Sequence, residues 1–350
     1  MEEVTGSSPV SSTILPVPPR TSGSSSLPKI TSGLSRFCYN PRHIMDVHFY
    51  EAFEEEIIVL RQYLPAQIRA HFTAHTIQEA GDSEPPAELI SIRTQSIIPP
   101  SWVGKVRGVV SRTTGYDHLV GCKIPCGHLP HYCSQAVAEQ AILLVTALLR
   151  KLPAQIAQFP AFHRDGLTGS ECAGKKLLVV GVGNIGAEIV KIGLALGMQV
   201  RGVDLVEKHE PLSYVTLEDG LAWADIIVCA MNLTKDNVCY FSYETLKKAK
   251  KGVVFVNVAR GEFTPTEDMV MLLDEGHVSG LALDVYENES SLAVALRSGR
   301  SDYPLLGRQN VILTPHNAFN TAEAVDRKAK QTIQQIEYFL TNKWFLWPVP

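Results

Sequence analysis

The pattern of hydrophobic and polar positions predicts an α/β protein. From Met45 onward, short runs rich in β-branched and aromatic residues alternate with stretches of helical periodicity. Strands are expected within residues 46–52, 69–75, 88–94 and 106–115, and a helix over residues 53–64. Such alternation is typical of parallel sheets whose strands are connected by helices.

The second half of the chain repeats this pattern more regularly. Apolar runs that are almost uninterrupted mark strands covered on both faces, as in a doubly wound parallel sheet. These runs are residues 175–180, 198–204, 225–230, 252–259, 279–285 and 310–315, with helices expected at residues 187–197, 243–251 and 265–276. The fold class expected is therefore α/β, with two Rossmann-like, doubly wound parallel-sheet domains and a cleft between them.

Two longer helices lie outside these units. The helix expected at residues 134–152 is apolar over much of its circumference, which fits burial between two lobes. The helix expected at residues 321–340 follows the last strand, and we expect it to pack back on the first lobe. That lobe would then be discontinuous, comprising residues 45–145 and 320–350, with residues 146–319 forming the second lobe.

Residues 1–44 differ in composition from the rest of the chain. Ser, Thr, Pro and Gly occupy 22 of the 31 positions from 5 to 35, so this stretch cannot bury enough apolar surface to offset its ordering entropy. We expect a disordered leader. A dispensable extension upstream of Met45 is favoured over an organellar transit peptide, because Glu2 and Glu3 are acidic and no amphipathic Arg-bearing helix is present.

Charge and cysteine content narrow the class of protein. The 32 basic and 36 acidic side chains give a formal charge of -4, which provides no electrostatic basis for binding nucleic acid or an anionic membrane. The longest uncharged apolar run, residues 141–149, has about half the length of a bilayer span. Seven cysteines without a CxxC pair fit reduced thiols. A soluble, cytoplasmic protein is expected.

A glycine pattern follows the first strand of the second lobe. Gly181, Gly183 and Gly186 have GxGxxG spacing, and Asp204 ends the next strand. The first glycine permits a tight turn, the second lets the backbone approach a pyrophosphate, and the third lets the helix lie close to the strand. Asp204 can accept both ribose hydroxyls, whereas its charge opposes a 2′-phosphate. The pattern therefore predicts NAD rather than NADP.

Charged side chains follow later strands at their C-terminal ends, where ligands bind in such sheets. Reducing a 2-oxoacid requires a cation on its carboxylate and carbonyl and an acid for the forming alkoxide. Arg260 suits the first role, because a guanidinium stays charged and matches a carboxylate at two points. His316 suits the second. A neighbouring carboxylate would orient its ring, and by sequence alone both Glu287 and Glu289 qualify.

One loop combines several potential metal ligands. Cys122, Cys126, His128, His131 and Cys133 are enough for a tetrahedral zinc site. Their spacing matches no standard zinc pattern, and buried neutral cysteines are commoner. We therefore expect no metal in the mechanism.

The sequence resembles the D-isomer-specific 2-hydroxyacid dehydrogenase family from Met45 to about residue 341. The resemblance rests on six strings in the family's order and approximate spacing: TTGYDH (113–118), VAEQ (137–140), GVGNIG (181–186), NVARGE (257–262), LDVYENE (283–289) and TPHNAF (314–319). The D-lactate dehydrogenase branch is the most similar. The resemblance implies a substrate domain built from both ends of the chain, a central NAD domain, and a homodimer whose interface includes the helix at 134–152.

The resemblance also implies roles for individual residues. His316 would be the proton donor in reduction, Glu289 its partner, and Arg260 the residue that binds the substrate. The cofactor would be lined by Gly181, Gly183, Asn184, Ile185, Gly186, Asp204, Met231, Asn232, Asn237, Val258, Ala259 and Asp284. The substrate would be lined by Thr114, Gly115, Phe319 and, from the first strand, Phe49 or Tyr50.

Two functions of different classes follow from these observations. The first is an NAD-dependent oxidoreductase that interconverts a 2-oxoacid and its D-2-hydroxyacid. The second is an NAD(H)-sensing corepressor or scaffold of the same fold, since fold alone does not fix function. The presence of all three catalytic residue types favours the enzyme. The identity of the substrate's tail is not determined, because pyruvate, branched or aromatic 2-oxoacids, hydroxypyruvate and glyoxylate all present the same carboxylate and carbonyl group to the enzyme.

Overall fold

The computed structural model of the chain describes residues 45–300 and 302–350. The disordered leader expected at residues 1–44 lies outside these residues. Two parallel sheets, of five and seven strands, organise the described part of the chain. The α/β class and the two doubly wound sheets expected from the sequence are confirmed.

The five-stranded sheet has the order β2-β1-β3-β4-β5, and all its pairs are parallel. Its first four strands lie within or directly beside the predicted apolar runs of the first lobe, and the fifth, of two residues, was not predicted. The strands are β1 (Met45–Phe49), β2 (Ile68–Phe72), β3 (Leu89–Ile92), β4 (Gly108–Ser111) and β5 (Cys126–Gly127). The helices among them are α1 (Glu54–Tyr63), α2 (Ile77–Ala80), η1 (Pro100–Trp102) and η2 (Asp117–Leu119).

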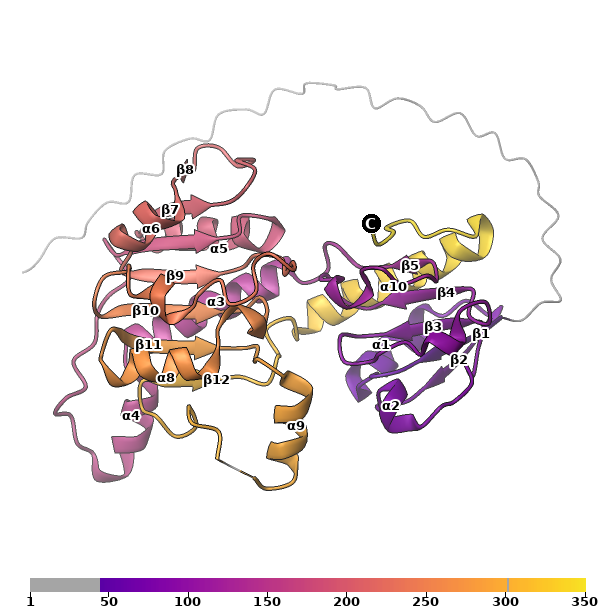
Figure 1. Cartoon of the computed structure of the whole chain (residues 1–350), viewed down its shortest axis with the longest axis horizontal. Coiled ribbons are helices and arrows are strands. Elements are labelled where there is room, and N and C mark those ends of the chain that lie inside the picture. Colours follow the sequence, from indigo (N-terminus) through magenta and orange to yellow (C-terminus); the bar gives the residue numbers. More distant parts are fainter. Residues whose placement is uncertain (1–44, 301) are drawn as a thin grey trace, which may run out of the picture. The chain divides into compact units, whose positions relative to one another are not determined.

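The C-terminal helix α10 (Ala322–Asn342) returns to this first sheet, where it packs on α1 and β4 (Figure 1). Tyr63 of α1 donates a hydrogen bond to Asp326 of α10 across 2.6 Å. Beyond the helix, the backbone N–H of His128 donates to the carbonyl of Trp347 across 3.0 Å. Both ends of the described chain thus contribute to one lobe.

The seven-stranded sheet has the order β12-β11-β10-β9-β6-β7-β8. Alternate residues of its strands enter two cores: Leu177 and Val179 pack under α3 and α5, and Leu178 and Val180 pack under the helices of the other face. The strands are β6 (Lys176–Val180), β7 (Gln199–Val203), β8 (Ser213–Tyr214), β9 (Ile226–Cys229), β10 (Val253–Asn257), β11 (Val278–Leu283) and β12 (Val311–Leu313). The helices are α5 (Asn184–Ala195), α6 (Leu217–Trp223), α7 (Tyr243–Leu246), η4 (Gly261–Phe263), α8 (Thr266–Asp274) and α9 (Glu289–Arg297).

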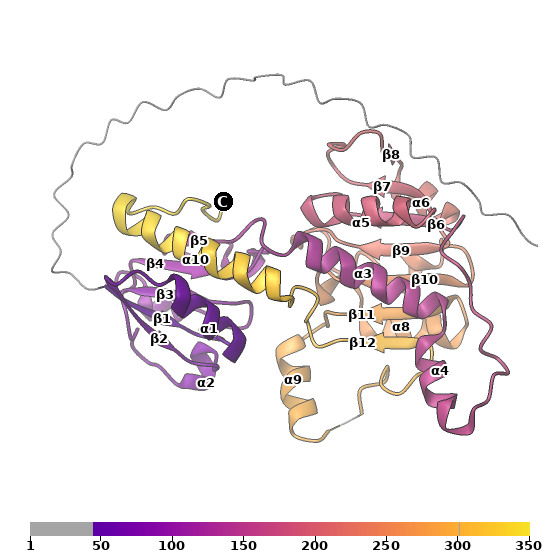
Figure 2. The ribbon, with the colours of Figure 1, turned by 180° about the vertical axis from the view of Figure 1, so that it is seen from behind.

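The long helix expected at residues 134–152 ends earlier, as α3 (Ser134–Leu149). Lys151 adopts a left-handed backbone with φ 53°, and Pro153 lies in the first turn of α4 (Leu152–Gln158), which η3 (Phe159–Ala161) continues. Figure 2 shows α3 crossing the strands of the seven-stranded sheet. In residues 45–300 and 302–350 no single helix is long and apolar enough to span a bilayer. By length and composition alone, α3 and the segment through Ala161 reach that threshold as a pair bent by 57°.

Candidate functional site

One pocket is lined by loops from both sheets, within a part of the chain that forms one compact unit. The loops after β3 and β4 come from the first sheet, and those after β9, β10, β11 and β12 come from the second. All of them leave the C-terminal ends of parallel strands, where α/β proteins bind ligands. The predicted site residues that line this pocket are Thr114, Gly115, Ile185, Met231, Asn232, Val258, Ala259, Arg260, Asp284, His316 and Phe319.

His316 and Glu289 are in direct contact. Nδ1 of His316 lies 2.8 Å from Oε1 and 3.0 Å from Oε2 of Glu289. Burial alone would raise the pKa of the Glu289 carboxyl, but the hydrogen bond and charge of His316 outweigh burial and hold that pKa below its usual value. Glu287, the competing acid, accepts the backbone N–H of Thr266 across 3.3 Å instead.

Asp284 orders the loop that carries His316. Its carboxylate accepts the hydroxyl of Thr314 at 2.5 Å and the backbone N–H groups of Asn317 and Ala318, each at 2.9 Å. Burial raises the pKa of Asp284, although these hydrogen bonds act in the opposite direction. Both carboxylate oxygens therefore already have partners within the loop, besides facing the pocket.

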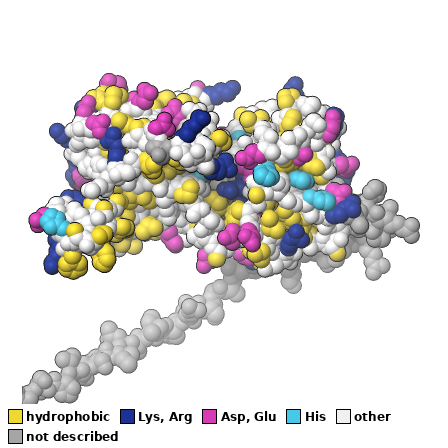
Figure 3. Space-filling model, turned by 90° about the horizontal axis from the view of Figure 1, so that it is seen from below, with side chains coloured by type: hydrophobic (Ala, Val, Ile, Leu, Met, Phe, Trp, Pro, Cys, Tyr) yellow, Lys and Arg dark blue, Asp and Glu magenta, His cyan; other side chains and the backbone are white. Residues whose placement is uncertain are grey.

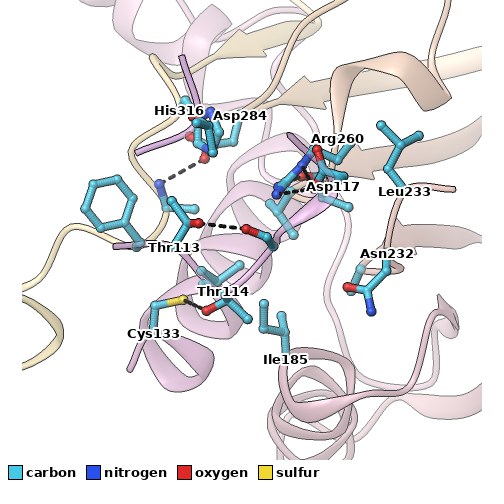
Figure 4. A pocket seen from close by; sticks show the side chains of 18 of the residues that line it. Thr113, Thr114, Asp117, Cys133, Ile185, Asn232, Leu233, Arg260, Asp284 and His316 are labelled. Carbon is cyan, nitrogen blue, oxygen red and sulfur yellow. Dashed lines mark hydrogen bonds and ion pairs between the residues drawn. The ribbon is translucent and has the colours of Figure 1, made fainter. Parts of the chain in front are cut away.

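Arg260 meets a residue that the sequence did not single out, Asp117 of η2 (Figure 4). Oδ1 of Asp117 accepts from Nε at 3.0 Å and from Nη2 at 2.8 Å, while Nη1 donates to the carbonyl of Ala259 at 2.9 Å. Burial would raise the pKa of Asp117, but the charge and hydrogen bonds of Arg260 lower it. Asp117 lies in the TTGYDH string at residues 113–118, and this motif was the only sequence signal that could have identified it.

The loop after β4 makes room for this arginine. A Cβ atom at Gly115 would lie 1.8 Å from Nη2 of Arg260, so only glycine permits the approach. Thr113 donates its hydroxyl hydrogen bond to the carbonyl of Gly115 across 2.7 Å, and Oγ1 of Thr114 lies 3.3 Å from Sγ of Cys133. These contacts fix the loop against the pocket wall.

The structure does not bring Tyr50 to the pocket. Tyr50 is buried beside Trp102, with ring centroids 6.4 Å apart, and its hydroxyl donates to Asp82. Phe49, the alternative, stacks on Phe72 in another core at 4.8 Å. Consecutive strand residues face opposite sides of a sheet, so Phe49 and Tyr50 enter the two cores on either side of it. Neither side chain points beyond the end of the strand towards the pocket.

Asn237 is also absent from the pocket wall. Its Oδ1 accepts the backbone N–H of Thr234 at 2.7 Å, and its Nδ2 donates to the carbonyl of Asn232 at 2.9 Å. Asn237 therefore closes the loop after β9, and Asn232 of the same loop lines the pocket.

The glycine turn after β6 has the geometry of a dinucleotide site. Gly181 has φ 90°, and a Cβ there would lie 2.5 Å from the backbone of Met231. A Cβ at Gly186 would lie 2.0 Å from the carbonyl oxygen of Gly181. At Gly183, by contrast, a Cβ would meet no atom within 4 Å, so the space beside this glycine is open. Helix α5 begins at Asn184, so its free N–H groups face that space.

Asp204 is held at the end of β7 by two backbone groups. Its carboxylate accepts the N–H of Val182 at 2.6 Å and that of Val206 at 3.1 Å. The side chain stays exposed. A fixed acid at this position, beside the glycine turn, fits the ribose of a bound dinucleotide.

The two histidines of the loop at 122–133 make separate contacts. Nδ1 of His128 lies 3.1 Å from the carbonyl of Thr114, and Nδ1 of His131 lies 3.2 Å from the side-chain nitrogen of Asn184. No group of three or more His, Cys, Asp or Glu residues that could hold a metal ion occurs in the part of the chain that the structure describes.

A doubly wound sheet with a dinucleotide turn, facing a pocket that contains arginine and a histidine paired with glutamate, defines the class of dinucleotide-dependent dehydrogenases. The family model described as "D-isomer specific 2-hydroxyacid dehydrogenase, NAD binding domain" matches residues 142–318. The chain belongs to this family. It is an enzyme, an NAD-dependent 2-hydroxyacid dehydrogenase, and NAD is its cofactor.

Named relatives agree with the family assignment. 2-Hydroxyacid dehydrogenase A of Aspergillus oryzae is 28% identical over 321 residues, which cover 85% of this chain and 90% of the relative. D-lactate dehydrogenase of Staphylococcus epidermidis is 31% identical over 237 residues, which cover 63% and 72%. The crystal structure of Aquifex aeolicus D-lactate dehydrogenase with NAD and lactic acid has a TM-score of 0.76 and 26% identity, over 85% of this chain and 96% of that chain.

Proposed function

We propose that the enzyme interconverts a 2-oxoacid and its D-2-hydroxyacid, with Arg260, Glu289 and His316 as the residues that act on the substrate. The observation that carries this proposal is the contact of Glu289 with His316, because His316 lines one pocket together with Arg260. We assign substrate binding to residues 45–145 and 320–350, and cofactor binding to residues 146–319.

Each residue of the trio has a separate task in reduction. When bound, NADH supplies the hydride that adds to the carbonyl carbon. Arg260 binds the carboxylate and polarises the carbonyl, with the loop of Thr114 and Gly115 beside it. His316 donates the proton to the carbonyl oxygen. Glu289 fixes the tautomer of the imidazole and offsets its positive charge.

The cofactor residues are assigned along the edge of the second sheet. Asp204 binds the adenosine ribose, and the turn from Gly181 to Gly186 receives the pyrophosphate. Ile185, Met231, Asn232, Val258 and Ala259 line the pocket towards the nicotinamide, and Phe319 lies beside the substrate's tail.

We also infer a homodimer in a reducing, cytoplasmic compartment. Ile156, Phe159 and Phe162 form an apolar cluster around α4 and η3, with exposed fractions of 66%, 73% and 76%. Hydrophobic surface gathers at the left of Figure 3, the side on which α4 lies in Figure 1. Exposed apolar clusters of this kind are typical of subunit interfaces. The six cysteines of the described residues are all free, as expected of a reducing compartment.

The test follows NADH oxidation by the purified full chain with a panel of 2-oxoacids, from glyoxylate through pyruvate to phenylpyruvate. His316→Ala is expected to lower turnover about 100-fold or more while leaving NADH binding unchanged. His163→Ala, at an exposed position paired with Asp165, is the matched control and is expected to be active.

Unchanged turnover in His316→Ala would contradict the assigned proton donor. A native protein that binds NADH and reduces no member of the panel would favour the sensor or scaffold instead.

A further inference from the structure

Arg93 is a second arginine in the pocket. It follows β3 and lines the same pocket as Arg260 and His316. Its Cζ lies 4.6 Å from the ring centroid of Phe319 and 5.7 Å from that of Phe53. The buried Nε of Arg93 has no hydrogen-bond partner, and its guanidinium forms no ion pair with any of residues 45–300 and 302–350.

The acid that contacts the backbone of Arg93 is already used there. The carboxylate of Glu51 accepts the main-chain N–H groups of Arg93 at 2.9 Å, Gln95 at 3.0 Å and Ser96 at 3.2 Å. These three donors occupy both oxygens of Glu51, and they hold the turn after β3. Glu51 thus positions the backbone of Arg93 and leaves its guanidinium without a counter-ion.

Two further acids near Arg93 are also paired. Glu289, which shares a second pocket with Arg93, contacts His316. The charge of Arg93 contributes to lowering the pKa of Glu56. The carboxylate of Glu56, however, forms ion pairs with Arg112 at 2.9 Å and with Lys328 at 2.6 Å. A buried donor without a partner is costly, and the Nε of the half-buried Arg93 is such a donor, so an anion from outside the chain would stabilise this arginine.

We propose that Arg93 forms a subsite for an anionic group at the tail of the substrate, so that the preferred substrates are 2-oxoacids bearing a second carboxylate or a phosphate ester. This proposal rests on the proposed function, in which Arg260 binds the first carboxylate. Arg93 stacks on Phe319, the residue assigned to the tail. A guanidinium presents several N–H donors in one plane, and both carboxylates and phosphates fit this arrangement.

Pairs of substrates with the same shape and different charge provide the test. Oxaloacetate and 4-methyl-2-oxopentanoate differ in whether the tail ends in a carboxylate or in two methyl groups, and 2-oxoglutarate and 5-methyl-2-oxohexanoate form a longer pair. A phosphate ester of hydroxypyruvate tests whether the anionic tail is a phosphate instead of a second carboxylate. The full chain with NADH is expected to show a kcat/KM about 10-fold to 100-fold higher for the anionic member, the size of one charge-assisted interaction.

The variant Arg93→Met removes the charge and keeps an unbranched side chain that can pack on Phe53 and Phe319. We expect it to lower kcat/KM for the anionic tails about 10-fold to 100-fold, mainly through KM, and to reverse the preference within each pair. Its kcat/KM for pyruvate, which has no anionic tail, is expected to fall less than that for either anionic tail. Arg297→Met, at an exposed arginine 3.6 Å from Glu79 on the rim of the second pocket, is the control and is expected to retain the native preference.

The proposal is overturned if the native enzyme prefers the methyl-bearing member of each pair, or if Arg93→Met lowers kcat/KM equally for all substrates. A native protein that reduces no 2-oxoacid contradicts the proposed function instead. In that case calorimetric titration of 2-oxoglutarate into the NAD-saturated chain tests the subsite separately: binding that Arg93→Met abolishes supports it, and no binding overturns it.

Discussion

At the scale of single residues, the charged side chains of the pocket are oriented by partners within the described chain, with Arg93 as the exception. Glu289 orients His316, and Asp117 orients Arg260. Because Nε and Nη2 both donate to one oxygen of Asp117, the direction of the guanidinium is fixed before substrate binds. Such preorganisation is how enzymes place charge where it develops in the transition state.

Asp117→Ala is therefore expected to lower kcat/KM for 2-oxoacids about 10-fold to 100-fold, because Arg260 loses a charge-assisted partner. Asp117→Asn keeps an oxygen acceptor and is expected to recover part of this loss. Steady-state kinetics and NADH titration of both variants would measure the effect. Equal activity of all three proteins would show that Asp117 does not position Arg260.

At the scale of elements, three of them meet at one buried ionic cluster. Glu56 comes from α1, Arg112 follows β4, and Lys328 comes from α10, and all three side chains are fully buried. Burial alone would raise the pKa of Glu56, but the charges of Arg112 and Lys328 outweigh burial and lower that pKa to about 2. Burial lowers the pKa of Lys328 to about 7, although the charge of Glu56 opposes this.

Glu56→Gln is expected to destabilise the native state by about 3 to 5 kcal/mol, because it leaves Arg112 and Lys328 without their shared charge. The lowered pKa of Glu56 means that its stabilisation is full above the ordinary value of 4.5 and is lost as the pH falls towards about 2. Urea denaturation near neutral pH and across this acid range would measure both effects.

Glu84→Gln, which removes an exposed partner of Lys105, is the control and is expected to change stability little. If Glu56→Gln were no less stable than this control, the cluster would not stabilise α10 on the first sheet.

At the scale of the whole molecule, the apolar cluster of Ile156, Phe159 and Phe162 predicts self-association. Replacing Phe159 and Phe162 together by Ser is expected to convert the dimer into a monomer, because it removes apolar surface that the partner would bury. Light scattering during gel filtration would measure the mass. Leu205→Ser, at a fully exposed leucine after β7, is the control and is expected to remain dimeric. A monomeric native protein would contradict the inference.

The sequence by itself determined the two sheets and ten of their twelve strands in chain order; β5 and β8, of two residues each, were not predicted. The reason is local: strands apolar on both faces, such as residues 176–180 and 253–257, have no stable position outside a covered sheet. The glycine turn is equally local, because a Cβ atom at Gly181 or Gly186 would clash with nearby backbone atoms. Arg260 and His316 could be selected because parallel strands end at one edge, whereas Glu289 was preferred to Glu287 only through the family resemblance.

Only the tertiary structure decided which partner each of these side chains has. Glu289 and Glu287 are equivalent in sequence, yet one contacts His316 and the other accepts a distant N–H. The contact of Arg260 with Asp117 joins residues 143 positions apart. Tyr50 was expected beside the substrate but enters a core, because the face of a strand end depends on packing. Pairing and burial arise from contacts distant in the chain, whereas periodicity and turn chemistry arise from neighbours, and so only the latter can be read from the sequence.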